Sequence, residues 1–559
     1  MNHPLRPVLA ALFLVTLIVR ALTALTLEHA GYLDAFYYYH LALNMADGRG
    51  LTESVIWNYL DDPQQLPRPG NQYWMPLTNL WGWLGIATLG RALGPWRAAQ
   101  APFVVGSALL PPLAAWLAWH EWRRRDWAIG AGVLTIFSGF YFTYWVVTDS
   151  YTPFALAVAL ALLALWKARQ RDKARWWALA GTGAGLSHLT RVDGALLVPV
   201  IALLLAWQHL RAAPRPDFRA FCRDAMLAAA GYLLLMGPWW ARNWWVVGTP
   251  FPGGAQTLWI RHYNEIFTYD LELGVQRYLA WGPGPILGSK VRSALWSSFI
   301  VLGSTQFFLA PFILVTLRDA ARRPLFKPFL LYTFTLLTAM PLLFTFPATR
   351  GSLLHSAAAL LPWMMALAPA GITRIVRWLA QRRRTWNVAQ ATRVLGAGFV
   401  GLSVLITLYI YLAGVWLPPA ANAINPPWNE RTRLYEEVET WLASAGVTHD
   451  ERIFVTDPPA YYVTTGRAAL VTPTDGPATL ARAAQDWDAR WLLLDASYGG
   501  RSSNYQEMYE AAAPAAGWRP VATFTDSLGR EAILFRFEGE GDGGEPTGFR
   551  NPSVLQHDG

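Results

Sequence analysis

The chain has 559 residues, of which 53% are hydrophobic and 30 are tryptophan, and its formal net charge is +9. This composition excludes an ordinary soluble enzyme and indicates a polytopic membrane protein. The basic residues form short clusters between apolar segments, as in cytoplasmic loops, so we expect no nucleic-acid partner. The single cysteine, Cys222, excludes an intrachain disulfide and a thiolate metal cluster.

Eleven apolar segments are candidates to cross a bilayer, which takes roughly 20 residues per helix. They are Val8–Leu27, Ala98–Trp119, Trp127–Val147, Tyr151–Trp166, Trp176–Leu189, Gly194–Trp207, Ala225–Trp240, Ala294–Leu317, Pro328–Phe346, Leu353–Ile372 and Val394–Leu417. A cytoplasmic N-terminus puts every dense Lys/Arg cluster inside, as the positive-inside rule requires. We therefore expect a multi-pass protein of the plasma membrane with an extracytoplasmic C-terminal domain.

Two segments test this topology. Thr190–Asp193 interrupts about 30 apolar residues between two basic clusters, and we interpret it as the outer tip of a hairpin, because a single crossing would strand one cluster outside. Trp74–Gly90 is apolar enough to cross, but a crossing there would reverse every later loop. We interpret it as an interfacial or re-entrant helix.

The predicted domains follow from these spans. Residues 1–417 form a helical membrane domain with long outer loops at 28–96 and 241–293, and Tyr37–Ala46 in the first loop is expected to be helical. After two Pro-Pro pairs, strands alternate with helices over 418–538, which predicts a small extracytoplasmic α/β domain. The expected strands are Arg452–Thr456, Ala469–Val471, Arg490–Leu494, Val521–Phe524 and Ala532–Phe537, and the expected helices are Leu434–Ser444, Ala478–Trp487 and Tyr505–Ala512. The Gly-rich, acidic tail at 539–559 is expected to be disordered.

Polar residues at the outer ends of the spans are the candidate site residues. Asp34 follows the first span directly, and a carboxylate at a membrane edge is either functional or an ordinary loop aspartate. Asp149 is either a ligand or an N-cap of the helix that follows. His40 and Glu53 of the first loop are candidate partners of Asp149, Glu53 being the weakest.

The basic candidates also keep two interpretations each. Arg191 and Asp193 form either a local ion pair or a ligand contact, and Arg350 is either a phosphate ligand or an interfacial side chain. His355 is either a ligand or a core histidine. The aromatic residues of the first loop, Tyr38 and Tyr73 among them, stack on a sugar ring or anchor the interface.

The order of these residues resembles the GT-C superfamily of membrane glycosyltransferases, which includes protein O-mannosyltransferases, lipid A aminoarabinose transferase and the oligosaccharyltransferase catalytic subunit. The resemblance covers about residues 1–415. It rests on Asp34 with the following Tyr-Tyr-Tyr-His, on Asn71 to Pro76, on Asp149, and on Gly185 to Gly194. The first loop has no Asp-x-Asp or Asp-Glu pair, which leaves metal dependence open.

The resemblance implies transfer of a sugar from a polyprenyl-phosphate or -pyrophosphate donor to a protein, lipid or glycan acceptor outside the cell. It implies Asp34 as the base, inversion at the sugar, and Arg350, Arg191 and His355 at the donor phosphate. Asp149, with His40 or Glu53, is the candidate site for a divalent cation such as Mg²⁺ or Mn²⁺. The alternative is a transporter or flippase, but that class places charges near the bilayer midplane and uses repeats that this sequence lacks.

Overall fold

The computed structural model describes residues 5–171, 174–210, 217–346, 348–351, 353–382, 386–419, 423, 425–496 and 503–539. The tail predicted to be disordered therefore lies outside the described residues, apart from Gly539. The chain forms two compact units, each built from separate stretches of sequence. Unit 1 comprises residues 1–28, 71–261 and 275–414, and unit 2 comprises residues 29–70, 262–274 and 415–559.

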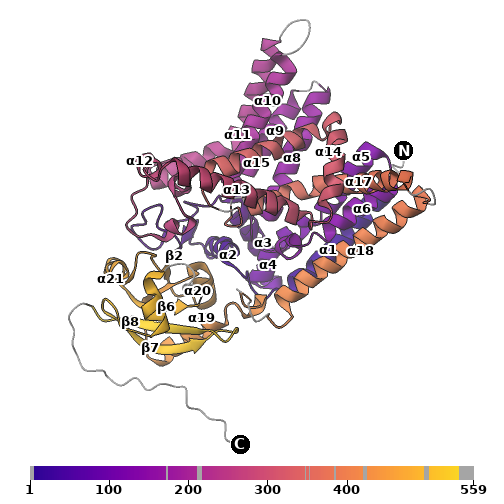
Figure 1. The fold of residues 1–559 in the computed structure, drawn as a ribbon. Coiled ribbons are helices and arrows are strands. Elements are labelled where there is room, and N and C mark those ends of the chain that lie inside the picture. The colour runs from indigo at the N-terminus through magenta and orange to yellow at the C-terminus, as the bar shows by residue number, and fades with distance from the viewer. Residues whose placement is uncertain are drawn as a thin grey trace, which may run out of the picture. The chain divides into compact units, whose positions relative to one another are not determined.

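Unit 1 is helical (Figure 1). Within the described ranges, seven stretches are long and apolar enough to cross a membrane, which confirms a membrane protein. They are α1 (Arg6–Thr26), α4 with α5 (Pro95–Ser107 and Leu110–Trp122), α8 (Tyr151–Arg171), η1 with α10 (Val192–Leu196 and Leu197–Leu210), α11 (Phe218–Val247), α16 with η4 and α17 (Leu353–Ser356, Ala357–Leu360 and Leu361–Arg382), and α18 (Val388–Val415).

The other four expected crossings fall on helices that are shorter or interrupted. The structure has α6 (Arg125–Ile136), α7 (Tyr141–Tyr144), α9 (Arg175–Thr190), α13 (Pro283–Ser304), α14 (Ala310–Arg322) and α15 (Lys327–Leu343) in these places. The expected span Trp127–Val147 is broken after Ile136, and the expected span Ala294–Leu317 is broken after Ser304. A contiguous apolar run does not reveal such breaks.

Buried polar side chains stabilise both breaks. The guanidinium of Arg20, on α1, donates to the carbonyls of Ile136 at 3.0 Å and Phe142 at 3.1 Å. The side-chain amide of Gln306, in the break between α13 and α14, donates to the carbonyl of Phe137 at 2.8 Å. The backbone N–H of Gly139 donates to the hydroxyl of Thr407 on α18 at 2.9 Å. Backbone groups freed inside a membrane protein need such partners.

The predicted hairpin at Thr190–Asp193 agrees with the helix packing. An added Cβ at Gly181 of α9 would meet Ala228 of α11, and one at Gly185 would meet Tyr232 and Leu235. Later residues of α9 thus contact later residues of α11, which means that the two helices run in the same direction. The chain must reverse between them, and α10 is the returning arm. The first residues of α9 and of α11 consequently lie at the same end of the unit.

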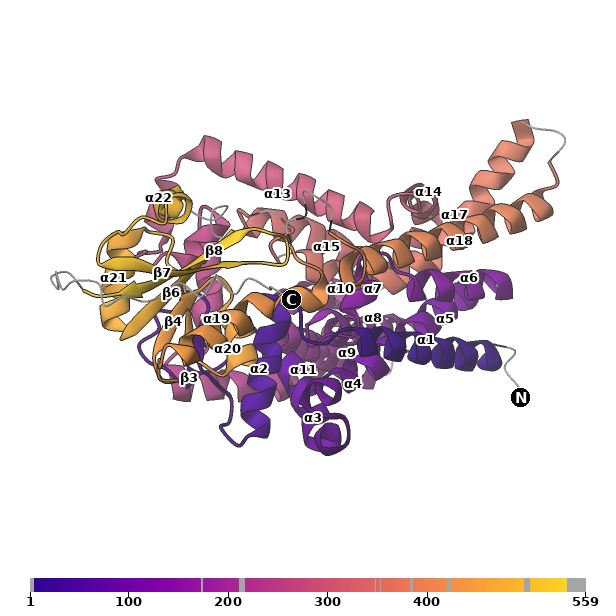
Figure 2. The same ribbon diagram turned by 90° about the horizontal axis from the view of Figure 1, so that it is seen from below.

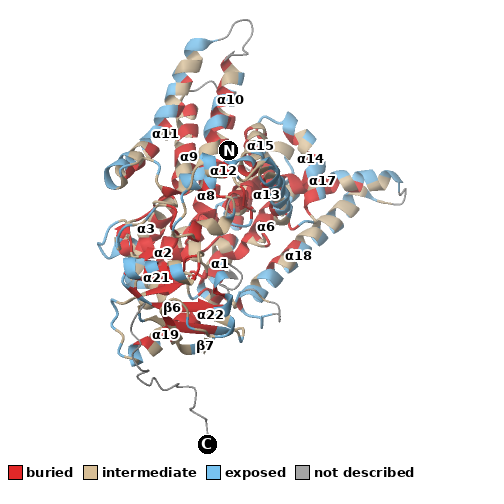
Figure 3. Ribbon diagram, turned by 60° about the vertical axis from the view of Figure 1, so that its left-hand side comes forward, coloured by how far each residue is buried: buried red, intermediate tan, exposed pale blue. Residues whose placement is uncertain are grey.

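The segment that we interpreted as interfacial or re-entrant forms α3 (Leu77–Leu93), which is not among the seven candidate crossings. It packs as a hairpin on α4, because Gly85 lies against Ala98 and Trp81 lies against Phe103 and Gly106. Figure 3 shows buried residues along α8 and α6, whereas α18 is mainly partly buried or exposed. The exposed side chains of α18 include Val394, Leu405 and Tyr409, as suits a lipid-facing helix.

Unit 2 contains the α/β fold that the sequence predicted for the C-terminal portion. The expected strands and helices are present as α19 (Arg433–Ser444), β4 (Arg452–Val455), β5 (Ala469–Val471), α21 (Pro477–Asp486), β6 (Ala489–Asp495), α22 (Gln506–Glu510), β7 (Trp518–Thr525) and β8 (Glu531–Phe537). The helix α20 (Pro458–Thr465), not expected from the sequence, connects β4 to β5. Figure 2 shows β4, β6, β8 and β7 side by side.

The first outer loop contributes an edge strand to this sheet, whose order is β2-β5-β4-β6-β8-β7. The strand β2 (Val55–Ile56) pairs in parallel with β5, and β5, β4 and β6 are also parallel, while β8 and β7 are antiparallel. The expected helix of this loop is α2 (Leu33–Ala46), which packs against α20. Strands β1 (Thr52–Glu53) and β3 (Arg68–Pro69) form a small second sheet.

The remaining elements are short. Unit 1 also contains η2 (Gly253–Trp259) and α12 (Val275–Leu279), and unit 2 contains η3 (Tyr263–Phe267), η5 (Trp428–Glu430) and η6 (Ser503–Tyr505). The segment with η3 is bound to the sheet domain, since Thr474 donates its backbone N–H to the carbonyl of Phe267 at 3.0 Å. Both outer loops of the sequence analysis therefore supply part of unit 2.

A buried charge cluster fixes the first loop. Arg68 Nε lies 2.7 Å from Glu53 Oε1, and Arg68 Nη1 lies 3.0 Å from Asp61 Oδ2, with all three side chains at most 3% exposed. Two buried carboxylates share one guanidinium here, so the cluster would carry a net negative charge unless one carboxylate binds a proton. Burial, with the charge of Asp61, raises the pKa of Glu53 to about 7, although Arg68 opposes the shift.

We expect Arg20→Met to destabilise unit 1, because it leaves the carbonyls of Ile136 and Phe142 buried without their donor. Each such loss costs about 1–3 kcal/mol. The measurement is the melting temperature of the detergent-solubilised protein, with Arg91→Met as the control, because Arg91 is exposed on α3. Equal melting temperatures for the two variants would contradict the role of Arg20.

We expect the stability of unit 2 to fall as the pH rises from about 4.5 to about 7. Glu53 loses its proton around pH 7 in the folded state, whereas an unfolded glutamate loses it around pH 4.3. The folded state therefore binds more protons than the unfolded state within this window, so folding is favoured at the acidic end. Glu53→Gln should reduce this slope. Hydrogen exchange of residues 29–70, corrected for intrinsic rates, would measure it, and an unchanged slope in the variant would refute the assignment.

Candidate functional site

Asp149 lies where the broken third span turns into α8. After α7 the chain is irregular until Ser150, and α8 begins at Tyr151. The Asp149 side chain is buried, and its Oδ1 accepts a hydrogen bond from the backbone N–H of Ser150. Because α8 begins two residues after Asp149, the carboxylate sits just before the position of a regular N-cap. The broken span thus presents a carboxylate at the start of a buried helix.

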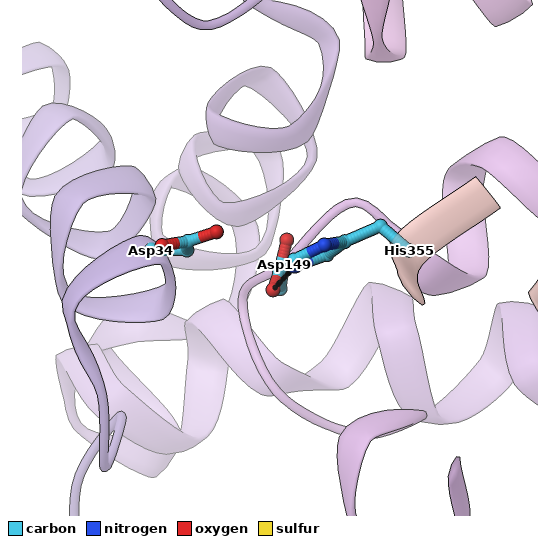
Figure 4. Close-up of side chains that lie close together, drawn as sticks. All are labelled: Asp34, Asp149 and His355. Atoms are coloured by element: carbon cyan, nitrogen blue, oxygen red, sulfur yellow. Dashed lines mark hydrogen bonds and ion pairs between the residues drawn. The ribbon is translucent and has the colours of Figure 1, made fainter. Parts of the chain in front are cut away.

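His355 pairs with Asp149. Figure 4 shows the Asp149 and His355 side chains pointing toward one another from different elements, the Asp149 loop and α16. The Asp149 Oδ2 and His355 Nε2 atoms are 3.0 Å apart, and both side chains are at most 6% exposed. The ring of Tyr151 stacks on the imidazole with centroids 4.5 Å apart. His355 is therefore held between two residues that flank the start of α8.

Arg191 connects three chain segments. Its Nε donates to Asp193 Oδ1 at 3.0 Å, its Nη1 donates to Ser150 Oγ at 3.3 Å, and its Nη2 donates to the carbonyl of Gly351 at 2.8 Å. The residue is extended, with φ −152°, and it ends α9. The local ion pair with Asp193 is thus present, and the same guanidinium also reaches the two other segments.

Asp193 completes this connection, because its Oδ2 accepts a hydrogen bond from the hydroxyl of Ser356. Hydrogen bonds thus join three loops, which contribute Asp149 and Ser150, Arg191 and Asp193, and Gly351, His355 and Ser356. Together with Tyr151, which stacks on His355, we call these residues the three-loop network. Of the residues predicted from sequence, the network brings together Asp149, Arg191, Asp193 and His355.

Arg350 lies at the edge of the three-loop network. Its side chain is exposed, while the next residue, Gly351, accepts the hydrogen bond from Arg191. Gly351 has φ +89°, a conformation that favours glycine and turns the chain sharply here. The network therefore fixes the backbone beside Arg350 and leaves its guanidinium at the surface.

Asp34 belongs to unit 2 and lies in the first turn of α2. Figure 4 labels it as well. Its side chain is partly buried, and the positive end of the helix dipole favours a carboxylate at this position. His40, six residues further along α2, is fully buried. Its Nε2 lies 3.0 Å from Asn44 Nδ2 and accepts the backbone N–H of Ser54 at 3.3 Å.

Burial, with the nearby charge of Arg49, lowers the pKa of His40 to about 3, so the imidazole is neutral at physiological pH. Glu53 contacts Arg68 in the buried cluster described above. Asp149 belongs to unit 1, and the described contacts of His40 and Glu53 place both residues among structural partners within unit 2.

The two tyrosines differ in exposure. Tyr38 is buried on α2, where its ring meets that of Tyr37 edge-on at 5.7 Å. Tyr73 is partly exposed in unit 1, beside Trp74, and its carbonyl lies close to Gly254. Of the two, Tyr73 presents the more accessible ring.

Sequence reasoning missed several members of the three-loop network: Ser150, Tyr151, Gly351 and Ser356. Each lies within two positions of a residue that was predicted, so the polar and aromatic neighbours of Asp149, Arg350 and His355 were the available signal. The sequence could not reveal that Ser356 pairs with Asp193, 163 residues away, or that His355 pairs with Asp149, 206 residues away.

Comparison with known proteins supports the resemblance. Residues 87–244 match the family model for dolichyl-phosphate-mannose-protein mannosyltransferase. This stretch contains Asp149, Arg191 and Asp193. None of the curated protein sequences matches the chain.

Solved structures share the fold at low sequence identity. The oligosaccharyltransferase of Archaeoglobus fulgidus, in a complex with Zn and sulfate, is 13% identical, with a TM-score of 0.54 over 93% of this chain and 72% of that one. ArnT from Cupriavidus metallidurans in the apo state is 14% identical, with a TM-score of 0.53 over 94% of this chain and 97% of that one. ArnT bound to undecaprenyl phosphate gives a TM-score of 0.51 at 13% identity, with the same coverage.

The oligosaccharyltransferase and ArnT structures show the fold of this chain, and the family model matches the stretch from within α3 to near the end of α11. The chain therefore has the fold of these two proteins and carries, over residues 87–244, a stretch similar to the mannosyltransferase family.

Proposed function

We propose that the protein transfers a sugar from a polyprenyl-phosphate donor to an acceptor at the extracytoplasmic side of the plasma membrane. The observation that carries this proposal is the three-loop network, which holds a buried carboxylate–imidazole pair beside two arginines. A reaction at a phosphate needs fixed cations where charge develops. ArnT from Cupriavidus metallidurans, which shares the fold, binds undecaprenyl phosphate.

The proposed reaction is an inverting displacement. Asp34 accepts the proton of the acceptor hydroxyl, and the hydroxyl oxygen attacks the anomeric carbon. The bond between that carbon and the phosphate oxygen breaks, and the phosphate leaves with the electron pair. A positioned base contributes typically about 10²–10⁴-fold to such a step. This role for Asp34 rests on its place directly after the first span and in the first turn of α2.

Arg350 and Arg191 are the proposed partners of the leaving phosphate. The planar guanidinium binds phosphate oxygens in pairs, and Arg350 offers it at the surface of the network. Arg191 stabilises this site by donating hydrogen bonds to the carbonyl of Gly351 and to the hydroxyl of Ser150. Donor binding thus depends on two arginines with different tasks.

Asp149 and His355 are the candidate ligands of a divalent cation. Each offers one ligand atom, and these atoms are close enough to bind the same ion. A carboxylate oxygen with an imidazole nitrogen suits Mn²⁺ or Zn²⁺ better than Mg²⁺, which prefers oxygen ligands. When bound, the cation would neutralise charge on the phosphate. The oligosaccharyltransferase with the same fold was crystallised with Zn.

We expect Asp34→Asn to lower sugar transfer by about 10²-fold or more, because asparagine cannot accept the proton. The measurement is transfer of a labelled sugar from a polyprenyl-phosphate donor in membranes, normalised to the amount of protein. Asp47→Asn is the matched control, because Asp47 lies at the other end of α2 and is 56% exposed.

Wild-type transfer in Asp34→Asn would refute the base. A wild-type protein that moves the lipid-linked donor across vesicles but never transfers its sugar would instead favour the transporter alternative.

We expect a chelator to abolish transfer and added Mn²⁺ to restore it. Asp149→Asn should raise the Mn²⁺ concentration needed for half-maximal activity, since it weakens one ligand. Asp126→Asn, an exposed aspartate at the start of α6, should leave that concentration unchanged. Full activity in the presence of chelator would show that Asp149 and His355 act without a metal.

A further inference from the structure

The short segment that leads into α2 is held by residues from the far end of the chain. Residues 29–32 come directly after the first span and precede Asp34 by only a few positions. They belong to the same compact unit as the chain after residue 415. The contacting residues lie in and next to η5 (Trp428–Glu430), in the linker between α18 and α19.

Two side chains of this linker bind backbone carbonyls of the segment. The indole Nε1 of Trp428 donates to the carbonyl of His29 at 2.9 Å. The Nη1 of Arg431 donates to the carbonyl of Gly31 at 2.8 Å. The Arg431 guanidinium lies 5.0 Å from the centroid of the Trp428 ring, and Trp428 is only 2% exposed. We call Trp428 and Arg431 the linker clamp.

Gly31 is the residue that makes this contact possible. Its φ of +85° lies in the region that glycine adopts without strain. A Cβ added there would lie 2.2 Å from Cε2 of Trp428, well inside the van der Waals contact distance. The indole therefore packs on the bare backbone at Gly31, and no other residue type fits this position without moving the ring.

The linker clamp acts on the start of a helix that has no side-chain cap of its own. The N-cap of α2 is Tyr32, which makes no side-chain capping hydrogen bond, and its ring meets Trp428 edge-on at 5.9 Å. Asp34 is the second residue of the helix. The carbonyls held at positions 29 and 31 thus fix the direction in which α2 begins, and with it the direction of the Asp34 side chain.

The middle of α2 and the loop that follows it are anchored to α20 in the same unit. The His40 ring lies 4.5 Å from the Tyr462 ring of α20, and Arg49 donates to the Tyr462 hydroxyl at 2.6 Å. Because the later part of α2 is held, a change in the linker clamp would tilt the start of the helix rather than release it. Such a tilt moves Asp34 more than any later residue of the helix.

We propose that Trp428 and Arg431 are positioning residues for catalysis: through Gly31 they set the orientation of Asp34. This inference rests on the proposed function, in which Asp34 is the base. It gives the C-terminal domain a part in the chemical step in addition to any part in recognising the acceptor. A misplacement of about 1 Å in a reacting group can cost about 10²-fold in rate.

The test compares Trp428→Leu, Trp428→Phe, Arg431→Lys and Gly31→Ala with wild type in the labelled-donor assay. Trp428→Leu and Gly31→Ala should lower kcat at least about tenfold with the donor KM unchanged, because a misplaced base affects the chemical step. Trp428→Phe keeps a ring on Gly31 and should lie between Trp428→Leu and wild type. Arg431→Lys keeps one donor and should likewise retain more activity than Gly31→Ala.

Two controls separate positioning from general damage. Trp441→Leu removes a tryptophan of α19 that packs on Trp491, and Arg433→Lys alters an exposed arginine of α19, so neither should change kcat. Each clamp substitution is also combined with Asp34→Asn. If the clamp acts through Asp34, it should lower the residual rate of Asp34→Asn no further, whereas general destabilisation lowers both backgrounds.

The outcomes distinguish the two proposals. Wild-type kcat in the clamp variants together with an inactive Asp34→Asn overturns the positioning role and leaves the proposed function intact. An active Asp34→Asn overturns the base itself. Additive losses in the double variants also overturn the positioning role, because the clamp would then act on something other than Asp34.

Discussion

The candidate site depends on the hydrogen bonds that the Arg191 guanidinium donates to Asp193, Ser150 and Gly351. This guanidinium joins segments that are 41 and 160 residues away in the sequence, and it does so from an extended residue between two helices. Its removal would leave the carbonyl of Gly351, the Asp193 carboxylate and the Ser150 hydroxyl without this donor. The Asp149–His355 pair lies on the same segments, so its geometry follows from the same contact.

The broken spans are the structural condition for that geometry. A continuous helix over Trp127–Val147 would satisfy its own backbone, but it could not deliver Asp149 through an irregular turn. The break is possible because Arg20 on α1, Thr407 on α18 and Gln306 between α13 and α14 supply its hydrogen-bond partners. Buried polar residues within apolar spans are costly, and here they allow the chain to leave the helix beside the site.

Much of the fold could be predicted from the sequence, because it follows local patterns. The length of the apolar segments and the basic loops between them predicted a polytopic membrane protein. Short strand-like segments alternating with helical ones predicted the C-terminal sheet, and the predicted bounds of β5 match the structure residue for residue. The helix breaks were missed because their cause, such as Gln306 reaching Phe137 across 169 residues, is not local. For the same reason the two-residue strand β2 and its pairing with β5 carried no signal. Site residues at span ends could be predicted singly, whereas their hydrogen bonds to one another depend on packing.

Arginine plays two different parts in this protein, and burial separates them. Arg20, Arg191 and Arg431 donate to backbone carbonyls where the chain is irregular, and Arg467 binds two more carbonyls together with Glu439. A guanidinium used in this way can reach an incoming phosphate only with its remaining donors, since giving up its carbonyls would leave them unsatisfied. Arg350 has its side chain at the surface while its neighbour Gly351 is fixed by Arg191. An exposed guanidinium on a fixed backbone is accessible to a ligand from solvent, so we propose Arg350, rather than Arg191, for the main direct contact with the donor phosphate.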